Sequence, residues 1–183
     1  MTNTNPPETL EAPPSPSPAD AGGAVSVAVP PAGRGYSAVG MIRPKTPANI
    51  GAVLRAAHVY GASMVAVQGE RCQIKSAQDT TKAWRHIPVL RGADLFEMIP
   101  YGAEPVAVDL VDGARPLPDF IHPHAAFYIF GPEDGTLGRP ILDRCRYRVM
   151  VPTRFCMNLA ATVNVVLYDR MAKAISAARR TAA

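Results

Sequence analysis

The chain has 183 residues and a formal net charge of +4, with 48% hydrophobic and 19% charged residues. This length suits one domain, and the composition excludes a wholly disordered protein, while the absence of a long apolar run argues against a membrane span. The three cysteines are widely spaced and form no C-x-x-C pair. That spacing argues against a disulfide framework or a zinc site and favours a reducing cytoplasm.

Residues 1–35 differ in composition from the rest of the chain. They contain 8 of the 19 prolines and few large apolar side chains. Repeated prolines prevent a helix, and too little apolar surface is present to offset the entropy of ordering. We therefore expect a disordered tail, with a partner-docking segment as the alternative. The folded domain is expected over residues 36–183, which carry 18 basic and 12 acidic residues.

After the tail, short β-rich runs alternate with helical runs. In chain order the sequence predicts a strand over 36–42, a helix over 49–60, a strand over 64–67, a helix over 76–84, a strand over 87–90, a helix over 93–99, strands over 105–111 and 125–130, a helix over 137–145, a strand over 147–151 and a helix over 157–178. This alternation predicts an α/β fold with a mostly parallel sheet and helices on both faces.

Ligands bind beyond the carboxyl ends of the strands in open α/β sheets, which makes loops 43–49, 109–118, 131–137 and 152–158 the candidate sites. The first of these loops ends at Asn49, a good helix N-cap, and Arg55 follows six residues later among apolar neighbours. A surface arginine on an amphipathic helix with a structural Asn cap is the alternative interpretation.

Two further loops, 131–137 and 152–158, carry polar residues that suit a site. In the loop that starts at Gly131, glycine allows close approach of the backbone to a ligand, and Glu133 and Asp134 precede a helix. Acidic side chains at that position also simply stabilise the helix dipole. The last loop leads into an apolar helix that contains Asn158 and Asn164, and buried asparagines need partners. We expect Asn164 to be structural and Asn158 to belong to a site.

Together these segments resemble the three motifs of the SpoU class of the SPOUT superfamily of RNA methyltransferases. The motifs are Asn49-x-Gly51-x3-Arg55 followed by Tyr60-Gly61, then the loop with Gly131 and Glu133, then Met157-Asn158 opening a helix that runs to Tyr168-Asp169. The resemblance covers residues 36–172. The chain departs from the family pattern at Thr136, where a glycine is usual, and at Cys156 and Ala160, where serines are usual.

The resemblance implies a fold with a deep C-terminal trefoil knot and a homodimer in which each site is completed by the other chain. It also implies methyl transfer from S-adenosylmethionine to a ribose 2′-hydroxyl of RNA. By the same resemblance the catalytic residues are Arg55, Asn49, Glu133 and Asn158, and the residues around the cofactor are Val108, Gly131, Val151, Cys156 and Met157. Arg55 is expected to stabilise charge on the oxygen and to position a phosphate, since its pKa is too high for a general base.

RNA binding requires positive charge, and the candidate contacts are Arg43, Lys45, Lys82, Arg85 and Arg154, with Trp84 as a stacking residue. A solvated charged face and a buried Trp are the alternatives. The His122-Pro123-His124 segment lacks a third metal ligand, so a loop without metal is expected.

The chain shows no added substrate-binding domain, which resembles the minimal family members that act on the tRNA wobble nucleotide. We therefore expect tRNA as the substrate, with rRNA second. A non-catalytic RNA-binding knot protein is a further alternative. An ordinary nucleotide-binding α/β enzyme is another, but no strand is followed by G-x-G-x-x-G or a P-loop.

Overall fold

The computed structural model describes residues 35–69, 71 and 82–182. The predicted tail, except for its last residue, and most of the predicted helix over 76–84 lie outside the described residues. The strands are β1 (Tyr36–Ile42), β2 (Met64–Gln68), β3 (Val89–Gly92), β4 (Glu104–Val108), β5 (Arg115–Pro116), β6 (Ala125–Phe130) and β7 (Tyr147–Met150). Within the described part of the chain they form one parallel sheet in the order β3-β2-β1-β6-β4-β7-β5.

The helices are of unequal length. They are α1 (Pro47–Val59), α2 (Arg139–Leu142) and α3 (Leu159–Ala182), with short 3₁₀ segments η3 (Ala83–Arg85), η4 (Leu95–Met98) and η5 (Leu117–Asp119). The predicted helices over 93–99 and 137–145 are therefore shorter than expected. Gly138, with a φ of 73°, and Pro140 fix the start of α2, while Pro100 follows directly after the end of the 93–99 segment.

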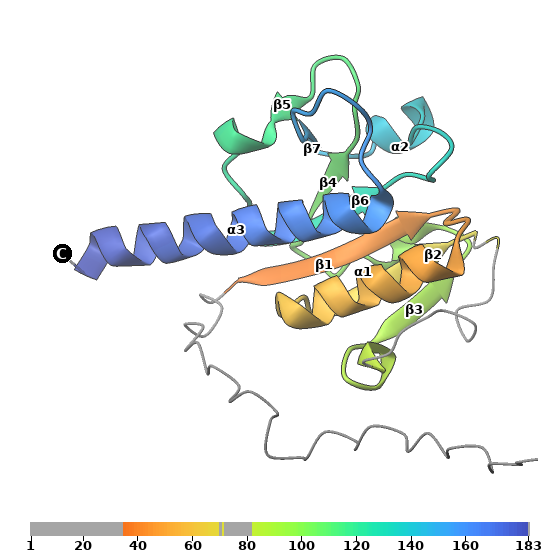
Figure 1. Ribbon diagram of the computed structural model, residues 1–183, viewed down its shortest axis with the longest axis horizontal. Helices are drawn as coiled ribbons and strands as arrows, with labels where there is room; N and C mark the ends of the chain where they lie inside the picture. Colours follow the sequence, from red (N-terminus) through yellow and green to blue (C-terminus); the bar gives the residue numbers. More distant parts are fainter. Residues whose placement is uncertain (1–34, 70, 72–81, 183) are drawn as a thin grey trace, which may run out of the picture.

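Alternating residues of the central strands belong to two apolar clusters, one on each face of the sheet. Val39 and Met41 belong to the cluster under α1 and α3, which lie side by side across one face (Figure 1). Ala38 belongs to the opposite cluster, together with Leu95 of η4 and Leu142 of α2. The predicted parallel α/β sheet with helices on both faces is confirmed, and the two long helices share one face.

Close packing on the second face depends on a glycine in β1. A Cβ atom at Gly40 would lie 2.5 Å from Cε1 of Phe127 and 2.6 Å from Cδ2 of Leu95. A larger residue would therefore push η4 away from the sheet. Within the described residues, no helix combines the length and the apolar character that crossing a bilayer requires.

A polar network fastens α3 to the loop that precedes β6. His122 Nδ1 lies 2.6 Å from Tyr128 Oη, and His122 Nε2 lies 2.8 Å from Asp169 Oδ2. Asp169 Oδ2 can only accept, so the neutral imidazole carries its proton on Nε2 and its Nδ1 accepts from the Tyr128 hydroxyl, whose oxygen also accepts from Arg170 Nη1 (3.1 Å). Burial lowers the pKa of His122 and raises the pKa of Tyr128 to about 12.

The same network also fixes the loop backbone. Arg170 donates to the carbonyl oxygens of Pro123, His124 and Tyr36, and Lys173 donates to those of Leu117 and Phe120. The His122-Pro123-His124 segment therefore lies in a loop, as the sequence predicted, and its first histidine has a structural task.

Candidate functional site

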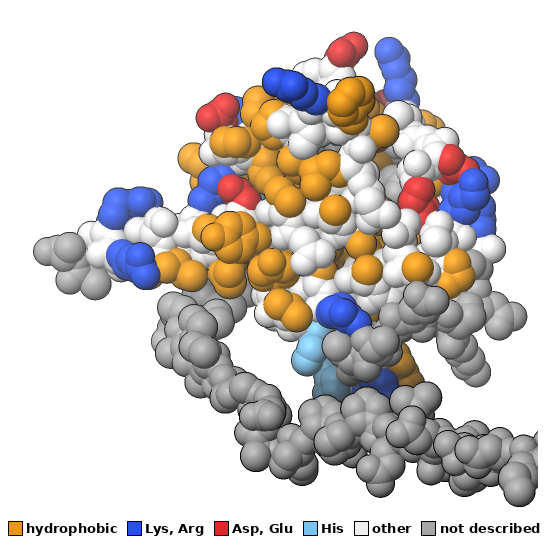
Figure 2. All heavy atoms as spheres, in the orientation of Figure 1, with side chains coloured by type: hydrophobic (Ala, Val, Ile, Leu, Met, Phe, Trp, Pro, Cys, Tyr) orange, Lys and Arg blue, Asp and Glu red, His pale blue; other side chains and the backbone are white. Residues whose placement is uncertain are grey.

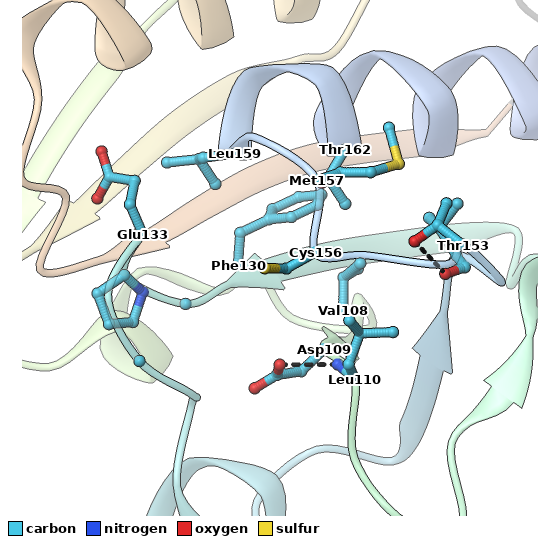
Figure 3. Close-up of a pocket in the computed structure, with 14 residues that line it drawn as sticks. Val108, Asp109, Leu110, Phe130, Glu133, Thr153, Cys156, Met157, Leu159 and Thr162 are labelled. Carbon is cyan, nitrogen blue, oxygen red and sulfur yellow. Dashed lines mark hydrogen bonds between the residues drawn. The ribbon is translucent and has the colours of Figure 1, made fainter.

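A cavity opens at the carboxyl ends of β4, β6 and β7, the edge of the sheet that the sequence singled out (Figure 3). It holds about 650 Å³ of empty space, part of which is open to solvent. Its fourteen lining residues are Val108, Asp109, Leu110, Phe130, Gly131, Pro132, Glu133, Gly135, Val151, Thr153, Cys156, Met157, Leu159 and Thr162.

All five residues that the family resemblance places around a cofactor line this one cavity. Val108 is the last residue of β4, Gly131 follows β6, and Val151 follows β7. Cys156 and Met157 lie in the loop that leads into α3. In that loop Thr153 Oγ1 donates to the carbonyl oxygen of Phe155 (2.7 Å), which closes a tight turn.

Asp109 is a lining residue that the sequence analysis did not select. Its Oδ2 accepts from the backbone nitrogen of Leu137 (2.7 Å), and its Oδ1 accepts from that of Leu110 (2.8 Å). Asp109 thus ties the end of β4 to the loop after β6. Its position directly after a buried strand, within a candidate loop, was the available signal.

Glu133 holds the first motif in place. Its carboxylate accepts from the backbone nitrogens of Lys45 (2.9 Å) and Thr46 (3.1 Å) and from Asn49 Nδ2 (2.9 Å). Burial alone would raise the pKa of Glu133, but the hydrogen bonds from Asn49, Lys45 and Thr46 bring it below its ordinary value. The group is therefore a fixed anion and a weak base at neutral pH.

The predicted N-cap role of Asn49 is wrong. Helix α1 begins two residues earlier than Asn49, at Pro47, because proline fits the first helical turn. Thr46 occupies the N-cap position without a side-chain cap hydrogen bond, and Asn49 lies inside the first turn. From there its side chain reaches Glu133 on one side and Asn158 on the other.

Asn158 is bonded at both ends of its amide. Its Nδ2 donates to Asn49 Oδ1 (2.8 Å), and its Oδ1 accepts from the backbone nitrogens of Ala160 (2.9 Å) and Ala161 (3.4 Å). Asn158 therefore caps α3 and joins it to α1. Asn164 Nδ2 donates to the carbonyl oxygen of Ala160 within α3 (2.8 Å), which fits the structural role expected for it.

Arg55 does not line the cavity of its own chain. It lies exposed on α1, in a groove between α1 and α3 that is lined by Ala48, Ala52, Arg55, Ala56, Val59 and Asn164. The structure thus brings together three of the four predicted catalytic residues, Asn49, Glu133 and Asn158, and leaves Arg55 on the neighbouring helix face.

Three of the predicted RNA contacts, Arg43, Lys45 and Arg154, lie at the carboxyl edge near the cavity, and all are exposed. Arg43 has a φ of 49°, and its backbone donates to Gln68 O (2.7 Å) and accepts from Arg71 Nε (3.1 Å). Lys45 Nζ lies 3.4 Å from Asp134 Oδ2.

Lys82 and Arg85 lie at the opposite end of the strands, away from the cavity. They precede β3, which runs parallel to β2, so they sit at its amino-terminal end. His86 stacks on His58 near the end of α1, with ring centroids 5.0 Å apart. Trp84 is 51% exposed rather than buried, and the Arg85 guanidinium lies 5.0 Å from its ring centroid. Among the described residues, no group of three or more His, Cys, Asp or Glu side chains is placed to hold a metal ion.

Solved structures share this fold at low sequence identity. The SpoU methyltransferase AviRb from Streptomyces viridochromogenes matches with 23% identity and a TM-score of 0.70, over 78% of this chain and 61% of that chain. AviRb has also been solved in complex with AdoMet. An rRNA methyltransferase from Sinorhizobium meliloti matches with 21% identity and a TM-score of 0.69, over 76% and 57%.

A third structure, concerned with 2-OH methylation of C/U34 on tRNA, matches with 22% identity and a TM-score of 0.67, over 79% of this chain and 99% of that chain. This chain therefore spans about three fifths of AviRb but nearly the whole of the tRNA-related protein. A sequence search of the curated proteins finds no match.

The sequence itself matches a family model over residues 37–168, which is most of the chain. That span contains the first two motifs, the third as far as Tyr168, and every residue that lines the cavity. The chain belongs to the SpoU rRNA Methylase family, in the SpoU class of the SPOUT superfamily.

Proposed function

We propose that the protein is an S-adenosylmethionine-dependent methyltransferase that methylates a ribose 2′-hydroxyl in RNA, with tRNA as its substrate. One observation carries the proposal. The side chains of Glu133, Asn49 and Asn158 join the three motif loops beside a cavity that Glu133 lines, and that cavity is lined by all five residues expected around a cofactor. Membership of the SpoU family supports the reaction class.

The cavity fits an adenosyl ligand in its chemistry. Val108, Phe130, Val151 and Leu159 supply apolar walls, while Asp109, Thr153 and Thr162 supply polar atoms. A Cβ atom at Gly131 would lie 3.4 Å from the backbone nitrogen of Leu137, so a side chain larger than alanine would crowd the loop that forms this part of the lining. S-adenosylmethionine, when bound, supplies an electrophilic methyl group on a sulfonium.

The chain's own residues then have separable tasks. Glu133 and Asn158 fix the loops that shape the cavity, because their side chains form hydrogen bonds to neighbouring elements. A ribose hydroxyl is a poor nucleophile and must be aligned while negative charge grows on its oxygen. The Arg55 guanidinium is always charged and planar, so it suits both stabilising that oxygen and gripping an adjacent phosphate.

We also propose a homodimer in which the partner's Arg55 completes each site. The support is that Arg55 lies outside its own cavity, in the groove between α1 and α3. Val59 and Tyr168, on the same two helices, are 67% and 56% exposed. Figure 2 shows hydrophobic side chains gathered along α3 on this face.

We further propose the C-terminal trefoil knot that the family resemblance implies. The insertion of β7 between the earlier strands β4 and β5 supports the knot.

The preference for tRNA rests on the match to the structure concerned with tRNA, of which this chain covers 99%, and on charge. Exposed Arg43, Lys45 and Arg154 near the cavity suit phosphate contacts, with Lys82 and Arg85 as more distant ones. The family description favours rRNA as the second candidate substrate.

The test is transfer of radiolabelled methyl groups from S-adenosylmethionine to separated tRNA and rRNA pools. Label in tRNA is expected. Label confined to rRNA would overturn the substrate, and cofactor binding without transfer to either pool would favour a non-catalytic RNA-binding protein.

A further inference from the structure

The charge of the cavity is opposite to that of the domain around it. Residues 36–183 carry 18 basic and 12 acidic side chains. Yet only two of the fourteen lining residues, Asp109 and Glu133, carry a full charge at neutral pH, and both charges are negative. The cavity is therefore an anionic pocket in a basic domain.

The two carboxylates are differently placed. Glu133 is committed to the start of α1, and Figure 3 shows its carboxylate pointing away from Cys156 and Met157. Asp109 lies at the end of β4, next to Val108 and Leu110. Both of its oxygens accept backbone N–H groups, which is the bonding pattern of an ionised carboxylate.

The proposed reaction changes the charge of the bound ligand. The C–S bond of a sulfonium breaks, the C–O bond of a ribose ether forms, and the hydroxyl proton leaves to solvent. The cofactor thus enters as a sulfonium cation and leaves as a neutral thioether. A fixed anion near the ligand attracts the first form and not the second.

We propose that Asp109 makes the cavity select the cationic cofactor over its neutral product. The selection holds S-adenosylmethionine more tightly than S-adenosylhomocysteine and so promotes product release after each transfer. This inference rests on the proposed function and deepens it. The rival role for Asp109 is mechanical, because its hydrogen bonds to Leu137 and Leu110 also hold the cavity together.

Calorimetric titration of the full-length protein separates the two roles. The ligands are S-adenosylmethionine, S-adenosylhomocysteine and sinefungin, which carries a charged amine where the sulfonium methyl stands. The wild-type protein is expected to bind both cations more tightly than the thioether. Asp109→Asn should weaken binding of the two cations by about three- to tenfold and change binding of the thioether less than about twofold.

Thr153→Val is the matched control, since it alters an uncharged polar residue in the same lining and should shift all three affinities together. Equal losses for all three ligands in Asp109→Asn would overturn the inference in favour of the mechanical role. Equal affinities in the wild-type protein would overturn it while leaving the proposed function intact. Failure to bind any of the three would overturn both.

Discussion

Asn49 and Asn158 are 109 positions apart in the sequence, yet Asn158 Nδ2 donates to Asn49 Oδ1 across 2.8 Å. Asn49 Nδ2 in turn donates a hydrogen bond to Glu133 Oε1 (2.9 Å). The chain of three side chains joins the first turn of α1, the loop after β6 and the start of α3. A change at one member is therefore expected to disturb all three loops around the cavity.

The contact between the two asparagines is tested by Asn158→Asp. The aspartate retains an oxygen that caps α3 but has no donor for Asn49 Oδ1, and it brings a second negative charge toward Glu133. We expect S-adenosylmethionine affinity to fall about tenfold with little loss of stability. Asn158→Ala should also lose the cap, which costs about 1 kcal/mol in the free energy of unfolding.

Titration calorimetry and urea unfolding measure these two effects. Asn164→Ala provides the control in the same helix, because among the described residues that side chain bonds to the backbone of α3 and not to another loop of the site. Wild-type cofactor affinity in Asn158→Asp would show that the contact does not shape the cavity.

Arg55→Ala should remove nearly all transfer while cofactor binding remains nearly intact. The reason is that Arg55 lies outside the cavity of its own chain. Its proposed task is to stabilise the negative charge that develops on the reacting ribose oxygen. A loss of about 10²–10³ in the single-turnover rate is expected, as for other donors to a developing oxyanion. Single-turnover transfer and cofactor titration are compared on the same preparation. Weakened cofactor binding in this variant would contradict the assigned role.

Mixing two inactive variants tests whether the partner's Arg55 completes the site. Arg55→Ala keeps an intact cavity, and Gly131→Val adds a bulky side chain to a lining residue, close to the Leu137 backbone, but keeps Arg55. In a mixed dimer one site then has both parts. Equal mixing of the exchanging subunits should restore about a quarter of the wild-type activity. Circular dichroism of Gly131→Val establishes that it is folded, and no recovery from two folded, exchanging variants would place Arg55 in its own subunit's site.

His122 makes the stability of the fold depend on pH. Burial lowers the pKa of His122 below its ordinary value of 6.5, and Arg170 and Lys173 oppose the effect of Asp169. As the pH falls through 6.5 the unfolded chain therefore takes up this proton before the folded chain does. The contribution of His122 to the free energy of unfolding is complete above pH 6.5 and decreases below it.

Urea unfolding between about pH 8 and about pH 5.5 measures this decline. His122→Gln removes the titrating group while retaining an amide that can bond to Asp169 or Tyr128. The slope of stability against pH should become shallower in this variant. An unchanged slope would mean that other groups cause the acid sensitivity.

Much of the sheet was predictable because its strands are apolar runs bounded by turn residues. The bounds of β1 and β6 agree with the sequence prediction, since both strands are buried and uninterrupted. β5 was not predicted, because its two residues, Arg115 and Pro116, show no strand pattern and depend on pairing with β7. Pairing between distant segments leaves no local signal in the sequence.

The candidate site was predictable to a similar extent. Short loops directly after strands locate the residues that line the cavity, because parallel strands end at one edge. The partners of Asn49 were not predictable. Because α1 starts two residues before Asn49, this side chain does not cap the helix but forms hydrogen bonds to Glu133 and Asn158. Lys82 and Arg85 show the same limit, because charge alone does not indicate which edge of the sheet a residue occupies.

Alkaline hydrolysis of RNA labelled by this protein tests ribose methylation most directly. A methyl group on a 2′-oxygen removes the nucleophile that cleaves the adjacent phosphodiester, so that bond survives alkali. We predict that the label from S-adenosylmethionine appears in alkali-resistant dinucleotides of tRNA, and that Arg55→Ala gives almost none. Label recovered in mononucleotides would place the methyl group on a base and contradict ribose methylation.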